Sequence, residues 1–230
     1  LVALLAMVAG VLPWMPAAGA VSPDIVISQV YGGGGNSGAT YTHDFIELFN
    51  RGAVPVSLAG WSVQYASATG SGNFGGTSAQ LTELPNVLLQ PGQYLLIQEA
   101  QGSGGTTSLP TPDVTDASPI AMSASSGKVI DASTNTGLGC NGGSTPCSAA
   151  QLAQIVDLVG YGSANFYEGS DPAPGLSNTT AAFRASGGCV DTDENDDDFT
   201  ADPAAPRNSA SPFNVCGGPP PPTPPTNGRK

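Results

Sequence analysis

Positive charge is what this chain lacks most. Of its 230 residues only six are Lys or Arg and one is His, against 18 Asp and Glu, so that the formal net charge is −12. Proteins that hold nucleic acid through its phosphates need basic residues gathered on one face. We therefore expect no direct nucleic-acid binding by this segment.

Long uninterrupted apolar runs are missing as well. A transmembrane helix needs about twenty such residues, and within LVALLAMVAGVLPWMPAAGA the apolar run is broken by Pro13 and Pro16. The run ends in the small residues Ala18-Gly19-Ala20, which are typical of a signal-peptide cleavage site. This ending favours a signal peptide over a buried N-terminal helix. We predict that residues 1–20 are a secretory signal peptide, truncated at Leu1 before its charged start. After cleavage we expect a secreted chain with no membrane span.

Catalytic motifs are scarce. There is no GxSxG serine elbow and no CxxC pair, and the run Gly32–Gly35 lacks the spacing of a phosphate-binding loop. His43, Asp44 and Glu47 are close in sequence, but on a strand Asp44 and Glu47 point to opposite faces. We expect no catalytic residues here and interpret Glu47 as a structural carboxylate that accepts hydrogen bonds from loop N–H groups.

One further pair of carboxylates, Asp157 and Glu168, invites comparison with the two acids of a glycosidase. The sequence indicates no sugar-binding cleft around them, although Phe166 and Tyr167 are aromatic neighbours. We interpret Asp157 as part of a strand end and Glu168 as part of the surface loop that follows.

Turn-forming residues are abundant, with 31 Gly and 21 Pro. Between them lie short runs of β-branched and aromatic residues, and no long amphipathic helix separates these runs. This pattern predicts an all-β sandwich over residues 21–216 with long Gly/Ser/Thr/Pro loops, in which Trp61 is a buried aromatic. We expect a short helix at Ala149–Gln154, capped by Ser148, and a broken apolar run at Leu81–Leu89. We expect strands at Asp24–Tyr31, within His43–Ser67, and at Gln93–Glu99, Ile120–Ser123, Lys128–Ala132, Ile155–Tyr161 and Thr179–Arg184.

The C-terminal end is of a different composition. Six of the eight residues from Pro219 to Thr226 are proline, a density typical of a stiff polyproline spacer. We predict that residues 217–230 link the sandwich to a downstream domain of a longer secreted protein.

Four cysteines follow the predicted signal peptide, an even number that indicates two disulfides in an oxidising compartment. Three pairings can form from four cysteines. We predict the pairing of nearest neighbours, Cys140 with Cys147 and Cys189 with Cys216. A zinc site is disfavoured because CxxC spacing is absent and the chain has one His.

The acidic run DTDENDDD, from Asp191 to Asp198, is the best candidate for a ligand site. Its alternating oxygen side chains resemble those of a calcium loop, although Asp196 occupies the position where an EF-hand needs Gly. Two readings stay open besides calcium: a solvated acidic loop, and a loop neutralised by a basic partner or by Arg207. The proposed Ca²⁺ ligands are Asp191, Asp193, Asn195, Asp197 and Asp202.

Several segments together resemble the lamin tail domain family in its secreted bacterial branch. These segments are IVISQVYGGGGN, DFIELFNRG, LAGWSVQY, QPGQYLLI, IVDLVGYG, NFYEG, NTTAAFR, CVDTDENDDDF and PRNSAS, and they span Ile25 to Ser211. The chain departs from the family pattern in two long loop insertions, at residues 101–118 and 133–147.

The resemblance implies an immunoglobulin-like β-sandwich that serves as a non-catalytic interaction or anchoring module. In secreted bacterial proteins such domains often precede a nuclease of the endonuclease/exonuclease/phosphatase type, and they bring no catalytic residues to carry over. The partners it leads us to expect are the downstream domain of the same chain and a cell-surface component or another protein. The alternative is that this segment is the N-terminal part of a secreted nuclease or related phosphoesterase.

Overall fold

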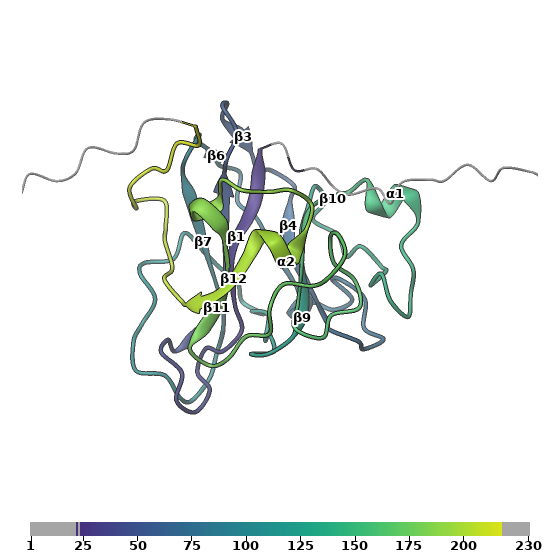
Figure 1. The fold of residues 1–230 in the computed structure, drawn as a ribbon, viewed down its shortest axis with the longest axis horizontal. Helices are drawn as coiled ribbons and strands as arrows, with labels where there is room; N and C mark the ends of the chain where they lie inside the picture. Colours follow the sequence, from purple (N-terminus) through teal and green to yellow (C-terminus); the bar gives the residue numbers. More distant parts are fainter. Residues whose placement is uncertain (1–21, 23, 218–230) are drawn as a thin grey trace, which may run out of the picture.

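The computed structural model describes Ser22 and residues 24–217. The predicted signal peptide, residues 1–20, and residues 218–230 of the predicted linker lie outside the described residues. Within the described part, two β-sheets pack against each other and a two-stranded ribbon stands at one end (Figure 1). The predicted all-β, immunoglobulin-like sandwich is confirmed.

The larger sheet has six strands in the order β12-β11-β1-β2-β7-β8. All neighbours pair antiparallel except β7 and β8, which run parallel at one edge. The strands are β1 Ile25–Tyr31, β2 His43–Asn50, β7 Tyr94–Gln101, β8 Val114–Thr115, β11 Thr180–Arg184 and β12 Phe199–Pro203. Because β1 pairs with β11, the sheet joins the first strand of the chain to residues near its C-terminal end.

The smaller sheet has four antiparallel strands in the order β10-β9-β4-β5. The strands are β4 Ser62–Ser67, β5 Leu81–Glu83, β9 Gly127–Ala132 and β10 Ile155–Tyr161. Strand β1 contacts both β9 and β10 across the interface between the sheets. The acidic network described below is built around this contact.

The two-residue period of strands decides which side chains enter the core between the sheets. On β2, Ile46 and Leu48 face the space between the sheets, whereas Phe45 and Phe49 pack in clusters on the other face. The outer face is covered by the C-terminal segment, since Phe49 packs with the disulfide of Cys189 and Cys216. This covering explains why seven of the eight residues of β2 are buried.

The remaining elements are short. Strands β3 Val56–Ser57 and β6 Leu88–Leu89 form the ribbon, consistent with Pro55 marking a sheet edge. Helix α1 spans Ala149–Leu152, ending before the predicted Gln154, and Ser148 caps it as expected. Helix α2 spans Asn195–Asp198, and two 3₁₀ turns, η1 and η2, span Ser78–Gln80 and Ala185–Gly188.

Two expectations about local structure were wrong, and one strand was not expected. Ile120–Ser123 forms no strand, because its amides bond to side chains: Ile120 N donates to Glu99 and Met122 N to Asp44. Strand β12, which directly follows the acidic run, was not among the predicted strands. Trp61 is partly buried and packs against the edge of the main core, in which Tyr161 is fully buried.

Both disulfides form as predicted, Cys140 with Cys147 and Cys189 with Cys216. They fasten different parts of the domain, since the first closes a separation of 7 residues and the second a separation of 27. Among the described residues, no helix has the length and apolar character needed to cross a membrane.

Candidate functional site

The five residues predicted to bind calcium occupy different environments. Asp191 and Asn195 turn inward: the Asp191 carboxylate pairs with arginines, and the Asn195 amide donates to Leu158 O at 3.0 Å. Asp193 is partly exposed and has a left-handed φ of 59°. Asp197 and Asp202 are exposed, and Asp202 lies on β12 opposite Ala181. Calcium binding by this set stays a prediction.

A buried guanidinium organises the acidic residues. Arg184, at the end of β11, has a fully buried side chain that donates to both oxygens of Asp157, at 2.8 and 2.9 Å. It also pairs with Asp191 at 2.8 Å and with Asp198 at 3.4 Å. Arg51 approaches Asp191 from the solvent side at 3.5 Å. Arg184 and Arg51 thus form the ion pairs with the acidic run. Arg207, the basic residue considered from the sequence, pairs with Glu47 instead.

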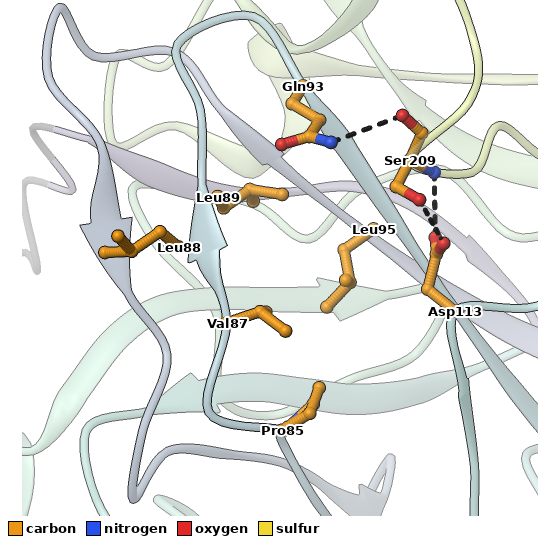
Figure 2. A pocket seen from close by; sticks show the side chains of 8 residues that line it. All are labelled: Pro85, Val87, Leu88, Leu89, Gln93, Leu95, Asp113 and Ser209. Atoms are coloured by element: carbon orange, nitrogen blue, oxygen red, sulfur yellow. Dashed lines mark hydrogen bonds between the residues drawn. The ribbon is translucent and has the colours of Figure 1, made fainter.

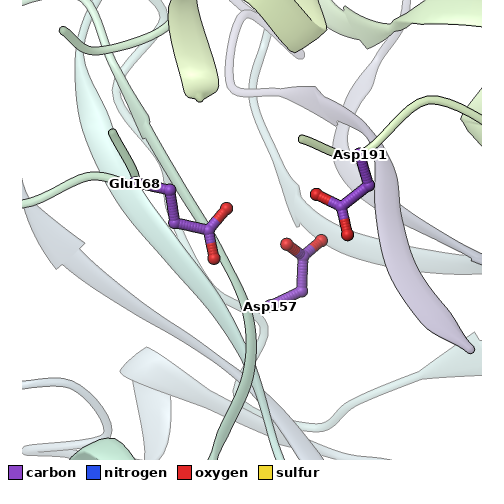
Figure 3. A group of neighbouring side chains, drawn as sticks. All are labelled: Asp157, Glu168 and Asp191. Carbon is purple, nitrogen blue, oxygen red and sulfur yellow. The ribbon is translucent and has the colours of Figure 1, made fainter. Parts of the chain in front are cut away.

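Glu168, which the sequence analysis placed in a surface loop, belongs to this network. Figure 3 shows its carboxylate facing those of Asp157 and Asp191, and oxygens of the three groups lie within 4.8 Å of one another. Its Oε2 accepts from the Asn195 amide at 3.3 Å, whereas its buried Oε1 has no hydrogen-bond partner. Burial, followed by the charge of Asp157, raises the pKa of Glu168 to about 10. A carboxyl group in such a place either keeps its proton or requires a cation.

The prediction that Glu168 lies in a surface loop was therefore wrong, since Glu168 is 5% exposed. Asp157 lies on strand β10 and is fully buried. The signal that could have found Asp157 and Arg184 is a lone charged residue inside an apolar strand, as in IVDLVGY and TAAFR, because such a charge must meet a partner when buried. Both oxygens of Asp157 accept from Nη2 of Arg184, and this buried ion pair favours a structural role over that of a glycosidase acid.

Asp44 and Glu47 bind on opposite sides of β2, as the strand periodicity predicted. Asp44 accepts from the N–H groups of Gly34 and Met122, at 2.8 and 2.9 Å, and so fastens two loops. His43 contacts Thr42 through Nδ1 at 2.9 Å. The three residues do not converge on one point.

Glu47 holds the C-terminal segment on the outer face of the larger sheet. Its carboxylate accepts from the Arg207 guanidinium and from the Arg207 backbone N–H, each at 2.6 Å. The same guanidinium stacks on the Tyr94 ring, 3.8 Å from its centroid. Glu47 is therefore the structural carboxylate that was expected.

A groove opens beneath the β3–β6 ribbon. It has a volume of about 310 Å³, and Figure 2 shows the residues that line it: Pro85, Val87, Leu88, Leu89, Gln93, Leu95, Asp113 and Ser209. Leu88 is 61% exposed, and Asp113 is held by the Ser209 N–H at 2.9 Å. The groove combines apolar walls with a few fixed polar groups, as binding sites commonly do.

Two buried carboxyl groups make the fold sensitive to pH. Burial raises the pKa of Glu99 to about 8 and that of Asp44 to about 7, and the charges of Asp116 and Asp44 add to the effect at Glu99. A raised folded-state pKa means that the folded protein binds more protons, so the contribution of Glu99 is complete below about pH 4.5 and is lost as the pH rises to about 8.

We therefore expect wild-type stability to fall relative to the Glu99→Gln variant between pH 5 and pH 9, by an amount on the order of 2–4 kcal/mol. Urea unfolding at several pH values measures the difference. Glu83→Gln, the same change at an exposed position, should follow the wild type. Parallel pH profiles for wild type and Glu99→Gln would contradict the raised pKa.

The fold, the two disulfides and the buried ion network define a β-sandwich module of the immunoglobulin-like class. The family model of the Lamin Tail Domain matches residues 18–162, more than half of the sequence, and the chain belongs to this family. The sequence resemblance to lamin tail domains is thereby confirmed. No curated protein matches the chain.

A solved structure shares the fold. It is the crystal structure of a DUF4876 family protein from Bacteroides thetaiotaomicron, with a TM-score of 0.52 and 12% sequence identity. The similarity covers 84% of this chain and 74% of that one. It extends well beyond residue 162, and strands β11 and β12 complete the larger sheet past the limit of the family match.

Proposed function

We propose that this chain is a non-catalytic interaction module of a larger extracellular bacterial protein. Membership of the lamin tail domain family supports the module, and two disulfides support an oxidising compartment. The observation that carries the interaction role is the groove beneath the β3–β6 ribbon, with Leu88 at its rim.

The groove suits an extended polypeptide with an apolar anchor. Leu88 and Val87 offer exposed apolar surface beside the buried walls of Leu89 and Leu95. Gln93 and Asp113 line the side of the groove and hydrogen-bond to Ser209, which fixes their position there (Figure 2). Apolar anchors in such pockets supply most of the binding free energy of small interfaces.

Selection of a random peptide library against the chain tests the proposal. We expect enrichment of peptides with Leu, Ile or Phe anchors, and binding at least about tenfold weaker in Leu88→Asp, because a charge would be buried at the rim. Leu88→Met keeps the apolar surface and should retain binding. Failure to enrich peptides, or equal binding by wild type and Leu88→Asp, would contradict the role of the groove.

The second candidate is that the chain is the N-terminal part of a secreted nuclease or related phosphoesterase. The observation that favours it is the proline-rich sequence of residues 217–230, which is typical of a spacer between domains. Sequencing the gene beyond the codon for Lys230 tests it. A domain with metal-dependent phosphodiesterase motifs would support a nuclease, and a domain of unrelated chemistry or a stop codon would exclude it.

A further inference from the structure

The carboxylates around Arg184 carry more negative charge than the nearby arginines neutralise. Within the part of the chain that the structure describes, four of them, Asp157, Asp191, Asp198 and Glu168, lie near two guanidinium groups, those of Arg184 and Arg51. With Glu168 ionised, two negative charges remain in a site where Glu168 is 5% exposed and the Asp191 side chain 1% exposed. Buried charge of this size demands a counter-charge or protonation.

The positions of the oxygens favour a cation over a proton. A protonated Glu168 would carry its hydrogen on Oε1, since Oε2 already accepts from the Asn195 amide, and that hydrogen would need an acceptor within about 3.5 Å. Oε1 is buried and takes part in no hydrogen bond among the described residues. The oxygens of the three carboxylates nevertheless lie within 4.8 Å of one another. Oxygens this close together can contact one ion, because calcium–oxygen bonds are about 2.4 Å long.

Asp157, Glu168 and Asp191 differ in how many oxygen lone pairs remain free to bind a cation. Each oxygen of Asp157 already accepts two hydrogen bonds, from Arg184 and from the N–H of Ile27 or Leu158. Glu168 Oε1 accepts none. Asp191 accepts from Arg184 on one oxygen and, at 3.5 Å, from Arg51 on the other, so it retains free lone pairs.

We propose that Glu168 and Asp191 bind a hard divalent cation, with Asp157 supplying negative charge from its fixed position beside Arg184. Carboxylate oxygens without nitrogen or sulfur ligands suit calcium or magnesium. Thr192 is exposed and Asp193 partly exposed, so the cluster lies next to solvent from which an ion can enter. The site shares only Asp191 with the ligand set predicted from the acidic run.

Calorimetric and thermal-shift titrations of the chain, first dialysed against EDTA, test the site with CaCl₂ and, separately, with MgCl₂. We expect saturable binding of one of these ions with a dissociation constant between about 10⁻⁴ and 10⁻³ M and a rise in melting temperature. Glu168→Gln should bind roughly tenfold more weakly because one charged ligand is lost. Asp196→Asn, the matched change at an exposed acid outside both ligand sets, should bind as the wild type does.

Three results would overturn the site: no saturable binding of either ion, equal binding by wild type and Glu168→Gln, or loss of binding in Asp197→Asn alone, which would move the ion to the exposed acidic run. If circular dichroism shows that Glu168→Gln does not fold, the wild-type protein gives the answer. The ¹³C resonance of the Glu168 side-chain carboxyl should then shift as the ion is added. An unchanged resonance at saturating ion would refute the proposal.

Discussion

Replacing Arg184 with Met should destabilise the domain by about 3–5 kcal/mol, which for a domain of this size can prevent folding. The side chain is fully buried, and its removal leaves Asp157 and Asp198, both buried, with uncompensated charge. It also removes a hydrogen bond to Ile27 O and a stacking contact with Phe199, whose ring centroid lies 4.4 Å away. Urea unfolding followed by circular dichroism measures the loss.

A second substitution separates charge from packing. If the loss is electrostatic, Asp157→Asn in the Arg184→Met background should recover part of it, because one buried negative charge disappears. Arg207→Met should cost less than Arg184→Met, since the Arg207 side chain is 22% exposed. A loss below about 1 kcal/mol for Arg184→Met would show that solvent reaches the network and screens it.

Removing the disulfide of Cys189 and Cys216 by replacing both with Ser should cost about 3–4 kcal/mol. The bond closes a separation of 27 residues and therefore restricts the unfolded chain more than the bond of Cys140 and Cys147, which closes 7. Its loss also frees the segment that carries Arg207 from the outer face of the larger sheet.

The matched control is the double Ser variant of Cys140 and Cys147, for which we expect about 2–2.5 kcal/mol. Both variants are compared with the wild type by urea unfolding without reductant. An equal or reversed order of the two losses would show that packing around each bond outweighs its effect on the unfolded chain.

The sandwich could be predicted from the sequence because local patterns of apolar and turn-forming residues identify its strands. Ile46 and Leu48 alternate with Phe45 and Phe49, and the turns between strands are marked by Gly and Pro. The disulfides could be predicted because the pairs formed between nearest neighbours. Glu47 could be assigned a structural role because its neighbours on β2 are apolar.

The ion network could not be predicted in the same way. Asp157 and Arg184 are separated by 27 positions, and they meet only because β10 of one sheet packs against β1 of the other while β11 pairs with β1. The acidic run suggested solvent-facing ligands, yet it turns Asp191 and Asp198 inward. Which acids of such a run are buried depends on tertiary contacts that no local pattern records.

The position of the second disulfide also determines how the domain responds to mechanical load. A force applied at Gly217 passes through Cys216 and the sulfur bridge to Cys189, and from there to β11, which is hydrogen-bonded to β1 in the middle of the sheet. Residues 190–215 lie outside this path. Without the bridge they could extend by roughly 90 Å before the load reached the same point. With it, the sandwich is pulled as a rigid body, and the segment that holds Arg207 over Tyr94 is spared.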